Sequence, residues 1–135
     1  MASIPESHQD LLKAEFCTIG TIDPDGYPQL TESWFLYDED DGKIKLSLNR
    51  TRFKAKYLEQ RPQCSIFLLD LPGAGRWLEI RGNATITADD DYAFADKLGQ
   101  KYGGVDLRVM DQPGESRVCV TVEPAKVNTW AMPSF

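Results

Sequence analysis

The segment from Lys43 to Leu58 constrains the fold of this chain most strongly, because it joins a strand with one buried face to a helix start rich in cations. Residues 43–48 alternate polar and apolar side chains strictly, which is the pattern of a half-buried β-strand. Thr51 follows as the expected N-cap of a helix. Four cations fall within seven residues at this helix start: Arg50, Arg52, Lys54 and Lys56.

This cationic helix start predicts an anion-binding site. The first turn of a helix exposes unpaired N–H groups and carries partial positive charge. Cationic side chains at this position are therefore repelled by the helix N-terminus, unless a bound anion neutralises the charge. A phosphate group would remove the conflict. The alternative is a solvated basic face on which Glu59 offsets Lys56, and the segment alone leaves both interpretations open.

Length and charge limit the classes of protein to which the chain can belong. With 135 residues, of which 41% are hydrophobic, the sequence predicts one domain over residues 1–135. The formal net charge of −6 argues against a nucleic-acid-binding protein, because such proteins need a broad positive surface. The basic segment is local, so we expect its anion to be small.

The N-terminal segment and the cysteines bear on location. Residues 1–16 carry scattered charges, and no apolar run reaches the length of about eighteen residues that indicates a membrane span. We therefore expect a cytoplasmic protein with no membrane insertion. Cys17, Cys64 and Cys119 are odd in number and lie far apart in apolar stretches, so we expect buried core residues and predict neither a disulfide framework nor a metal site.

Turn signals divide the chain into a compact series of strands. Residues 23–26 (DPDG) and 41–42 (DG) fit tight turns, and helices are expected over residues 7–14, from Thr51 and from Asp89. Hydrophobic periodicity predicts about six strands, the first three forming an antiparallel meander. The expected strands are residues 16–22, 28–37, 43–48, 64–69, 77–87 and 117–122, with a last β-rich stretch at 127–130.

The inventory of reactive side chains excludes several enzyme mechanisms. His8 is the only histidine, which excludes Ser-His-Asp and Cys-His hydrolases and a multi-histidine metal site. Residues 73–75 (GAG) lack the third glycine of a dinucleotide-binding fingerprint, and no P-loop occurs. An anion site without a strong acid–base pair is typical of a protein whose cofactor performs the chemistry.

Four short motifs occur in the order and spacing of one group of proteins: IPESHQDLL at 4–12, IDPDGYPQLT at 22–31, RFKAKYL at 52–58 with Arg61-Pro62, and WLEIRG at 77–82. On these motifs the chain resembles the split-barrel flavoproteins related to pyridoxamine 5′-phosphate oxidase. Within them it is similar to the short F420-dependent reductases, the flavin/deazaflavin oxidoreductases of group B. The motifs are less specific for the cofactor, because relatives bind FMN, F420 or haem-like ligands in the same cleft.

The resemblance implies a mainly β fold with flanking helices, namely a six-stranded antiparallel FMN-binding split barrel. It also implies a homodimer with a cofactor in each of two interface clefts. The basic segment is implied to grip the cofactor phosphate, with five candidate residues: Ser47, Asn49, Arg52, Lys54 and Lys56. Arg50 is an additional cation that either meets the glutamate tail of F420 or faces water.

The second strand is implied to lie along the cofactor ring. Its candidate contacts are Pro28, Gln29, Thr31 and Ser33, and ordinary strand polarity explains Thr31 and Ser33 equally well. Trp77 and Trp130 are expected either to line the cleft, of their own or of the other subunit, or to pack as buried aromatic residues.

We therefore expect an oxidoreductase that transfers hydride from reduced F420 to an electron-poor small molecule of the enone, quinone or tetrapyrrole type. The protein would orient the reactants, exclude water and stabilise charge. The sequence identifies no catalytic residue, and solvent or Arg81 is the candidate proton source. Two alternatives stay open: an FMN-dependent oxidoreductase, and a non-catalytic module that binds a flavin, haem or another flat ligand.

Overall fold

The computed structural model describes residues 1–133, so the last two residues of the predicted domain lie outside it. Its strands are β1 (Cys17–Ile22), β2 (Pro28–Ser33), β3 (Leu36–Asp38), β4 (Lys43–Asn49), β5 (Gln63–Leu69), β6 (Arg76–Ala88), β7 (Arg117–Val122) and β8 (Lys126–Ala131). Its helices are α1 (Phe53–Gln60), α2 (Ala93–Lys101) and two of 3₁₀ type, η1 (Glu6–Lys13) and η2 (Leu107–Met110). No helix within residues 1–133 is long and apolar enough to cross a membrane.

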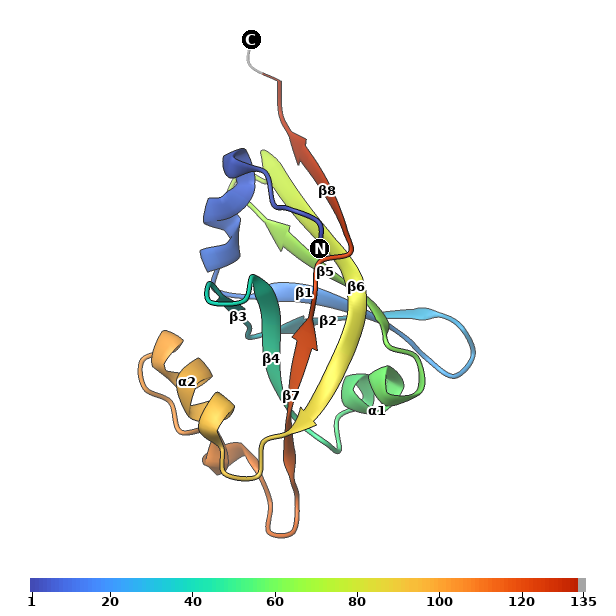
Figure 1. Ribbon diagram of the computed structural model, residues 1–135, viewed down its shortest axis with the longest axis vertical. Helices are drawn as coiled ribbons and strands as arrows, with labels where there is room; N and C mark the ends of the chain where they lie inside the picture. The colour runs from blue at the N-terminus through green and yellow to red at the C-terminus, as the bar shows by residue number, and fades with distance from the viewer. Residues whose placement is uncertain (134–135) are drawn as a thin grey trace.

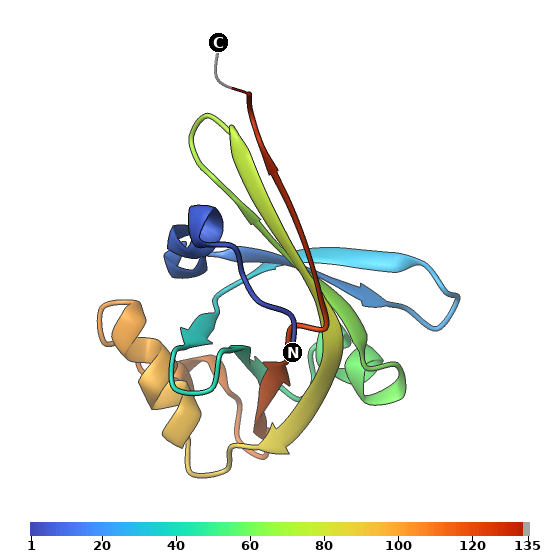
Figure 2. The ribbon, with the colours of Figure 1, turned by 45° about the horizontal axis from the view of Figure 1, so that its top comes forward.

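One curled antiparallel sheet forms the body of the molecule. Its strand order is β2-β1-β5-β6-β7-β4-β3, and β8 pairs with β6. The long strand β6 produces the curl, because residues 76–83 pair with β5 and β8 whereas residues 84–88 pair with β7. Figure 1 shows α1 and α2 on opposite sides of β4 and β7. Figure 2 shows the β1–β2 hairpin projecting from the curled sheet. The predicted mainly β fold with flanking helices is confirmed, with eight described strands in place of six.

The predicted strand over residues 28–37 is divided in two. Its first part, β2, pairs with β1, and its second part, β3, pairs with β4. At the break the backbone bonds to the end of α2 instead of a neighbouring strand: the Phe35 N–H donates to Tyr102 Oη (3.1 Å) and Lys101 Nζ donates to the Phe35 carbonyl (2.8 Å). The expected succession of antiparallel pairings is correct, but α2 interrupts the strand that carries it.

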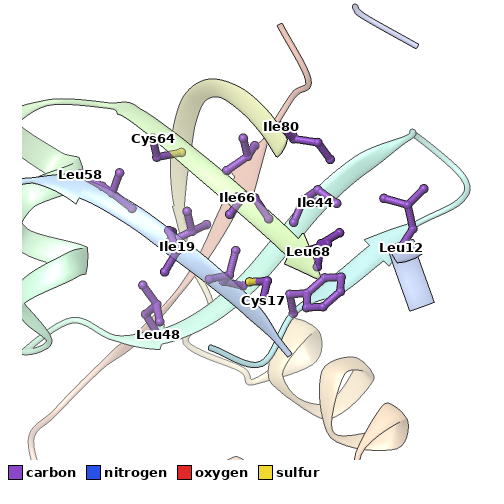
Figure 3. Close-up of a cluster of buried hydrophobic side chains, with 14 of the residues drawn as sticks. Leu12, Cys17, Ile19, Ile44, Leu48, Leu58, Cys64, Ile66, Leu68 and Ile80 are labelled. Carbon is purple, nitrogen blue, oxygen red and sulfur yellow. The ribbon is translucent and has the colours of Figure 1, made fainter. Parts of the chain in front are cut away.

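The hydrophobic core fills the inside of the curled sheet. Figure 3 shows Cys17 and Cys64 among neighbours that include Leu58 and Ile66, all of them buried. Burial raises the pKa of the Cys17 and Cys64 thiols to about 12, so both are neutral at physiological pH. All three cysteines are buried and free, which confirms the prediction that they are buried core residues.

His8 is buried although it lies in a polar N-terminal segment. Its Nδ1 is 2.8 Å from Ser7 Oγ, and its Nε2 is 2.9 Å from the carbonyl oxygen of Trp130. The helix expected over residues 7–14 is the 3₁₀ helix η1, which begins at Glu6 and has no side-chain cap. His8 therefore fastens η1 to β8.

Gly82 lies where β6 passes close to the turn that follows β7. A Cβ atom at this position would overlap the carbonyl oxygen of Glu123 and would lie 3.1 Å from Val122 Cγ1. We expect Gly82→Ala to lower the free energy of unfolding by about 1–3 kcal/mol, the range for overpacking a filled site. Urea denaturation measures this change. The control is Gly75→Ala, where a Cβ meets no atom within 4 Å; equal stability of the two variants would contradict the prediction.

Candidate functional site

A cavity of about 640 Å³ lies where the ends of β2 and β4 meet α1, α2 and η2. One end is cationic and polar, with Arg52 and Lys54 beside Asn49. The other end is apolar and is lined by five residues: Phe16, Trp34, Leu98, Leu107 and Met110. The cavity therefore suits a ligand with an anionic group at one end and a flat apolar part at the other.

The cationic end is built at the start of α1. Arg52 directly precedes the helix, Lys54 lies in its first turn, and that turn contains no acidic residue. Within residues 1–133 neither cation forms an ion pair with a carboxylate. Lys54 Nζ has only long contacts, 3.3 Å to Thr31 Oγ1 and 3.5 Å to the Glu32 carbonyl oxygen. Two cations and a helix N-terminus thus face the cavity with no opposite charge paired to them.

The surroundings of Lys54 disfavour the charged form of its side chain. Partial burial lowers the pKa of Lys54, and the neighbouring Arg52 charge lowers it further. A bound anion would oppose both effects, because it favours the charged ammonium. The direction of this pKa shift therefore agrees with a site that is completed by a negative ligand.

The expected N-cap at Thr51 is wrong. Helix α1 begins at Phe53, the N-cap position is Arg52, and no side chain caps the helix. The Thr51 hydroxyl instead donates to Asn49 Oδ1 (2.7 Å), and the Thr51 N–H donates to the same oxygen (2.9 Å). The side-chain hydrogen bonds at this turn point back toward β4, which leaves the first N–H groups of α1 without a side-chain cap.

A buried ion pair supports the polar wall of the cavity, to which Arg117 contributes. Arg117 Nη2 donates to Asp111 Oδ1 (2.7 Å), and the two side chains are only 5% and 4% exposed. Arg117 Nη1 also donates to Ser47 Oγ (3.2 Å). Burial alone would raise the pKa of Asp111, but hydrogen bonds from Arg117, Tyr92 and Asn49 lower it to about 2. The pair therefore stays ionised and rigid across the physiological pH range.

The apolar end is an aromatic wall with an open side. The Trp34 ring stacks on Tyr102, with centroids 4.1 Å apart and planes 6° from parallel. Phe16 and Met110 lie at the rim and are 45% and 51% exposed. Such a surface can pack against the face of a flat ring and exclude water from one side of it.

The structure brings together part of the predicted site. Five predicted residues line the cavity: Ser33, Ser47, Asn49, Arg52 and Lys54. Thr31 contacts Lys54 Nζ from β2. The other predicted residues lie outside this cavity of the single chain: Pro28, Gln29, Arg50, Lys56 and Trp77.

The five predicted residues outside the cavity lie on β2, on β6 and in or next to α1. Pro28 and Gln29 are at the hairpin end of β2, whereas the cavity meets its other end. Arg50 Nη1 pairs with Glu59 Oε1 (3.2 Å), and Lys56 is exposed on α1. Trp77 packs against Phe67, with ring centroids 5.7 Å apart, on the sheet face opposite the core.

Sequence reasoning missed the far wall of the cavity. Trp34, Leu107, Met110 and Arg117 come from a strand break, a 3₁₀ helix and the start of β7, which no local motif joins. The available signal was Arg117 at the head of an apolar strand, six residues after Asp111. A cation in that position needs a buried partner, and Asp111 provides it.

The side chains of the cavity favour binding over acid–base catalysis. Its carboxylates are Glu32 and Glu115, and it contains no histidine. The described part of the chain holds no group of three or more His, Cys, Asp or Glu side chains that could bind a metal ion. The residues present can hold an anion, cover a flat ring and exclude water.

Comparison with known proteins finds one matching family and several similar structures. Residues 4–131 match the pyridoxamine 5′-phosphate oxidase family. An F420 reductase of known structure is 27% identical, with 93% of this chain and 98% of that chain covered and a TM-score of 0.79. A conserved hypothetical protein of Mycobacterium tuberculosis (24% identity, 98% and 91% covered, TM-score 0.75) and HupZ of Group A Streptococcus (18%, 98% and 100%, 0.69) share the fold. None of the curated proteins compared with the chain matches it.

Proposed function

The chain belongs to the pyridoxamine 5′-phosphate oxidase family, as the four motifs indicated, and we propose that it is an F420-dependent oxidoreductase. Reduced F420 bound in the cavity would supply hydride to an electron-poor small molecule such as an enone, a quinone or a tetrapyrrole. Similarity to an F420 reductase supports F420 as the cofactor. FMN, which carries the same kinds of group, is the second candidate.

The observation that carries this proposal is the pair of cations without carboxylate partners in a cavity that also has an aromatic and apolar end. Arg52 and Lys54 suit a phosphate group, which both cofactors contain. Trp34 and Met110 suit the flat ring of either cofactor. A cavity built only for an apolar ligand would not hold the partly buried ammonium of Lys54 next to a second cation at a helix start.

The side chains of this protein would contribute orientation and a dry environment. Arg52 and Lys54 would hold the phosphate, and Ser33 with Thr31 would offer hydroxyl groups from the end of β2. Trp34 would exclude water from one side of the ring. The proton that completes substrate reduction would come from solvent, because no cavity side chain is placed as a dedicated acid.

The absorbance spectrum of the purified protein, followed by titration with FMN and F420, tests the proposal. We expect F420 to bind and reduced F420 to be oxidised when menadione, an enone or biliverdin is added. A yellow protein saturated with FMN that ignores F420 would favour the FMN-dependent alternative. Binding of F420 without oxidation across the whole panel would favour a non-catalytic module.

Cofactor affinity is expected to fall at alkaline pH because Lys54 must be charged to bind phosphate. The pKa of Lys54 in the free protein is lowered, and a bound phosphate raises it, so affinity is complete below the free-protein pKa and falls as pH rises through it. The Kd measured from about pH 7 to pH 10 should show this fall. In Lys54→Arg the fall should move to higher pH; superimposable profiles would place Lys54 away from the phosphate.

A further inference from the structure

The side chain of Asn49 lines the cavity but has no hydrogen-bonding group left for a ligand. Its Nδ2 donates to Asp111 Oδ1 (2.9 Å) and Glu115 Oε1 (3.1 Å). Its Oδ1 accepts from the N–H and the hydroxyl of Thr51, at 2.9 and 2.7 Å. An amide has two donor hydrogens and two acceptor lone pairs, so all four positions are occupied. Two carboxylates on one side also fix which end of the amide faces them.

A rigid support holds the donor end of this amide. Asp111 also accepts from Arg117 Nε (3.1 Å), Arg117 Nη2 (2.7 Å) and Tyr92 Oη (2.7 Å). Arg117 is anchored in turn to Ser47 on the neighbouring strand. A bidentate, buried arginine–carboxylate pair has little freedom, so it fixes the position of Asn49.

The acceptor end of the amide holds the residue directly before Arg52. Asn49 Oδ1 accepts from the N–H and the hydroxyl of Thr51, and the Arg52 N–H donates to the backbone carbonyl of Asn49 (3.0 Å). Asn49 thus holds two of the three residues of the short link 50–52 that precedes α1. Lys54 differs, because it belongs to α1 itself and reaches Thr31 on β2. Arg52 thus depends on Asn49 for its position, whereas Lys54 does not.

We propose that Asn49 is a positioning residue that acts through Arg52: the buried Asp111–Arg117 pair orients the Asn49 amide, and the amide orients the link that presents Arg52 to the anion. This inference rests on the proposed cofactor site. It replaces direct hydrogen bonding of Asn49 to the cofactor phosphate, which the sequence had suggested.

A double-mutant cycle tests the proposal, with the Kd of FMN, F420 and inorganic pyrophosphate as the measurements. We expect Asn49→Ala to weaken binding about tenfold in the wild-type background and less than about twofold in the Arg52→Ala background. In the Lys54→Ala background the factor should stay near about tenfold. If Asn49 contacted the anion directly, its replacement would cost the same factor in all three backgrounds, and the proposal would be overturned.

A second pair of variants covers the case in which Asn49→Ala does not fold. Asn49→Asp places a third carboxylate against Asp111 and Glu115 and should weaken pyrophosphate binding at least about tenfold. Adding Glu115→Gln supplies a donor and should recover the affinity to within about threefold of wild type. No recovery would overturn the proposal. Asn83→Asp, on an exposed position of β6, controls for the added charge.

The pyrophosphate titration separates this inference from the proposed function. A wild-type protein that binds pyrophosphate but neither FMN nor F420 would defeat the proposed function, and the cycle would still decide the role of Asn49. A wild-type protein that binds none of the three would defeat both.

Discussion

Replacing Arg52 and Lys54 together by alanine is expected to weaken the binding of F420 or FMN by about 3–5 kcal/mol, since each charge-assisted hydrogen bond to a phosphate contributes about 1.5–3 kcal/mol. This corresponds to a rise in Kd of roughly two to four orders of magnitude. Stability should not fall, because neither cation pairs with a carboxylate in the described residues. Removing their repulsion at a helix start can even stabilise α1.

The matched control for this variant removes two cations elsewhere. Lys13 lies on η1 and Lys43 at the start of β4, and neither lines the cavity. The variant Lys13→Ala/Lys43→Ala has the same net charge as Arg52→Ala/Lys54→Ala, so it reports any general effect of charge on an anionic ligand. Titrations of both variants at equal ionic strength, with thermal melts, decide the matter. A lower melting temperature with unchanged cofactor affinity would show that Arg52 and Lys54 serve the fold.

The cationic half of the site could be predicted because its signal is local. Arg52 and Lys54 follow an alternating strand within a few residues, and a helix start must lie close to the strand that precedes it. Hydrophobic alternation also predicts most of the strands, because each strand buries one face. These features need no knowledge of which strands pair.

The aromatic half could not be predicted because it depends on tertiary contacts. Tyr102 of the segment after α2 stacks on Trp34 and bonds to Phe35, at the break that divides the single strand predicted over residues 28–37. The pair of Asp111 and Arg117 is also joined only when the loop after η2 folds back to β7. Residues that meet only through tertiary folding show no fixed spacing in a single sequence, so no sequence pattern predicts their contact.

Gln29 and Trp77 are predicted site residues whose contacts with a cofactor cannot be judged from one chain alone. Both were predicted to contact the cofactor, and both lie outside the cavity of one chain. Trp77 lies on the sheet face opposite the core, next to Phe67 and across from Trp130 on β8. A partner chain against this face would change what these residues contact.

We propose that the chain forms a homodimer through this outer face. Leu30 on the edge strand β2 is 69% exposed and Trp130 on the edge strand β8 is 41% exposed. Partly exposed Phe67 and Trp77 lie between these edges. Exposed apolar side chains distributed over one sheet face are typical of an interaction surface, and a two-fold axis lets one surface serve both copies.

A charge at the β2 edge of this surface is expected to separate the two chains. Leu30→Asp should fold normally, because substitution at so exposed a position usually changes stability by no more than about 0.5 kcal/mol. Sedimentation equilibrium should give about twice 15.2 kDa for the wild type and the single-chain mass for Leu30→Asp. Val109→Asp, at a still more exposed apolar residue of η2, should remain a dimer.

Loss of the dimer is expected to abolish cofactor binding, with a rise in Kd of at least roughly a hundredfold, because a ring in the cavity of one chain stays open to water at Phe16 and Met110. Trp34 lines the cavity and would cover only one side of a bound ring, so the partner chain would have to cover the other. Dilution of the wild type below its dissociation constant should therefore release F420 in step with dissociation. A monomeric Leu30→Asp variant that binds F420 as tightly as the wild type would show that one chain suffices. The anion site at Arg52 and Lys54 would then stand without the dimer, since every residue of that site comes from the same chain.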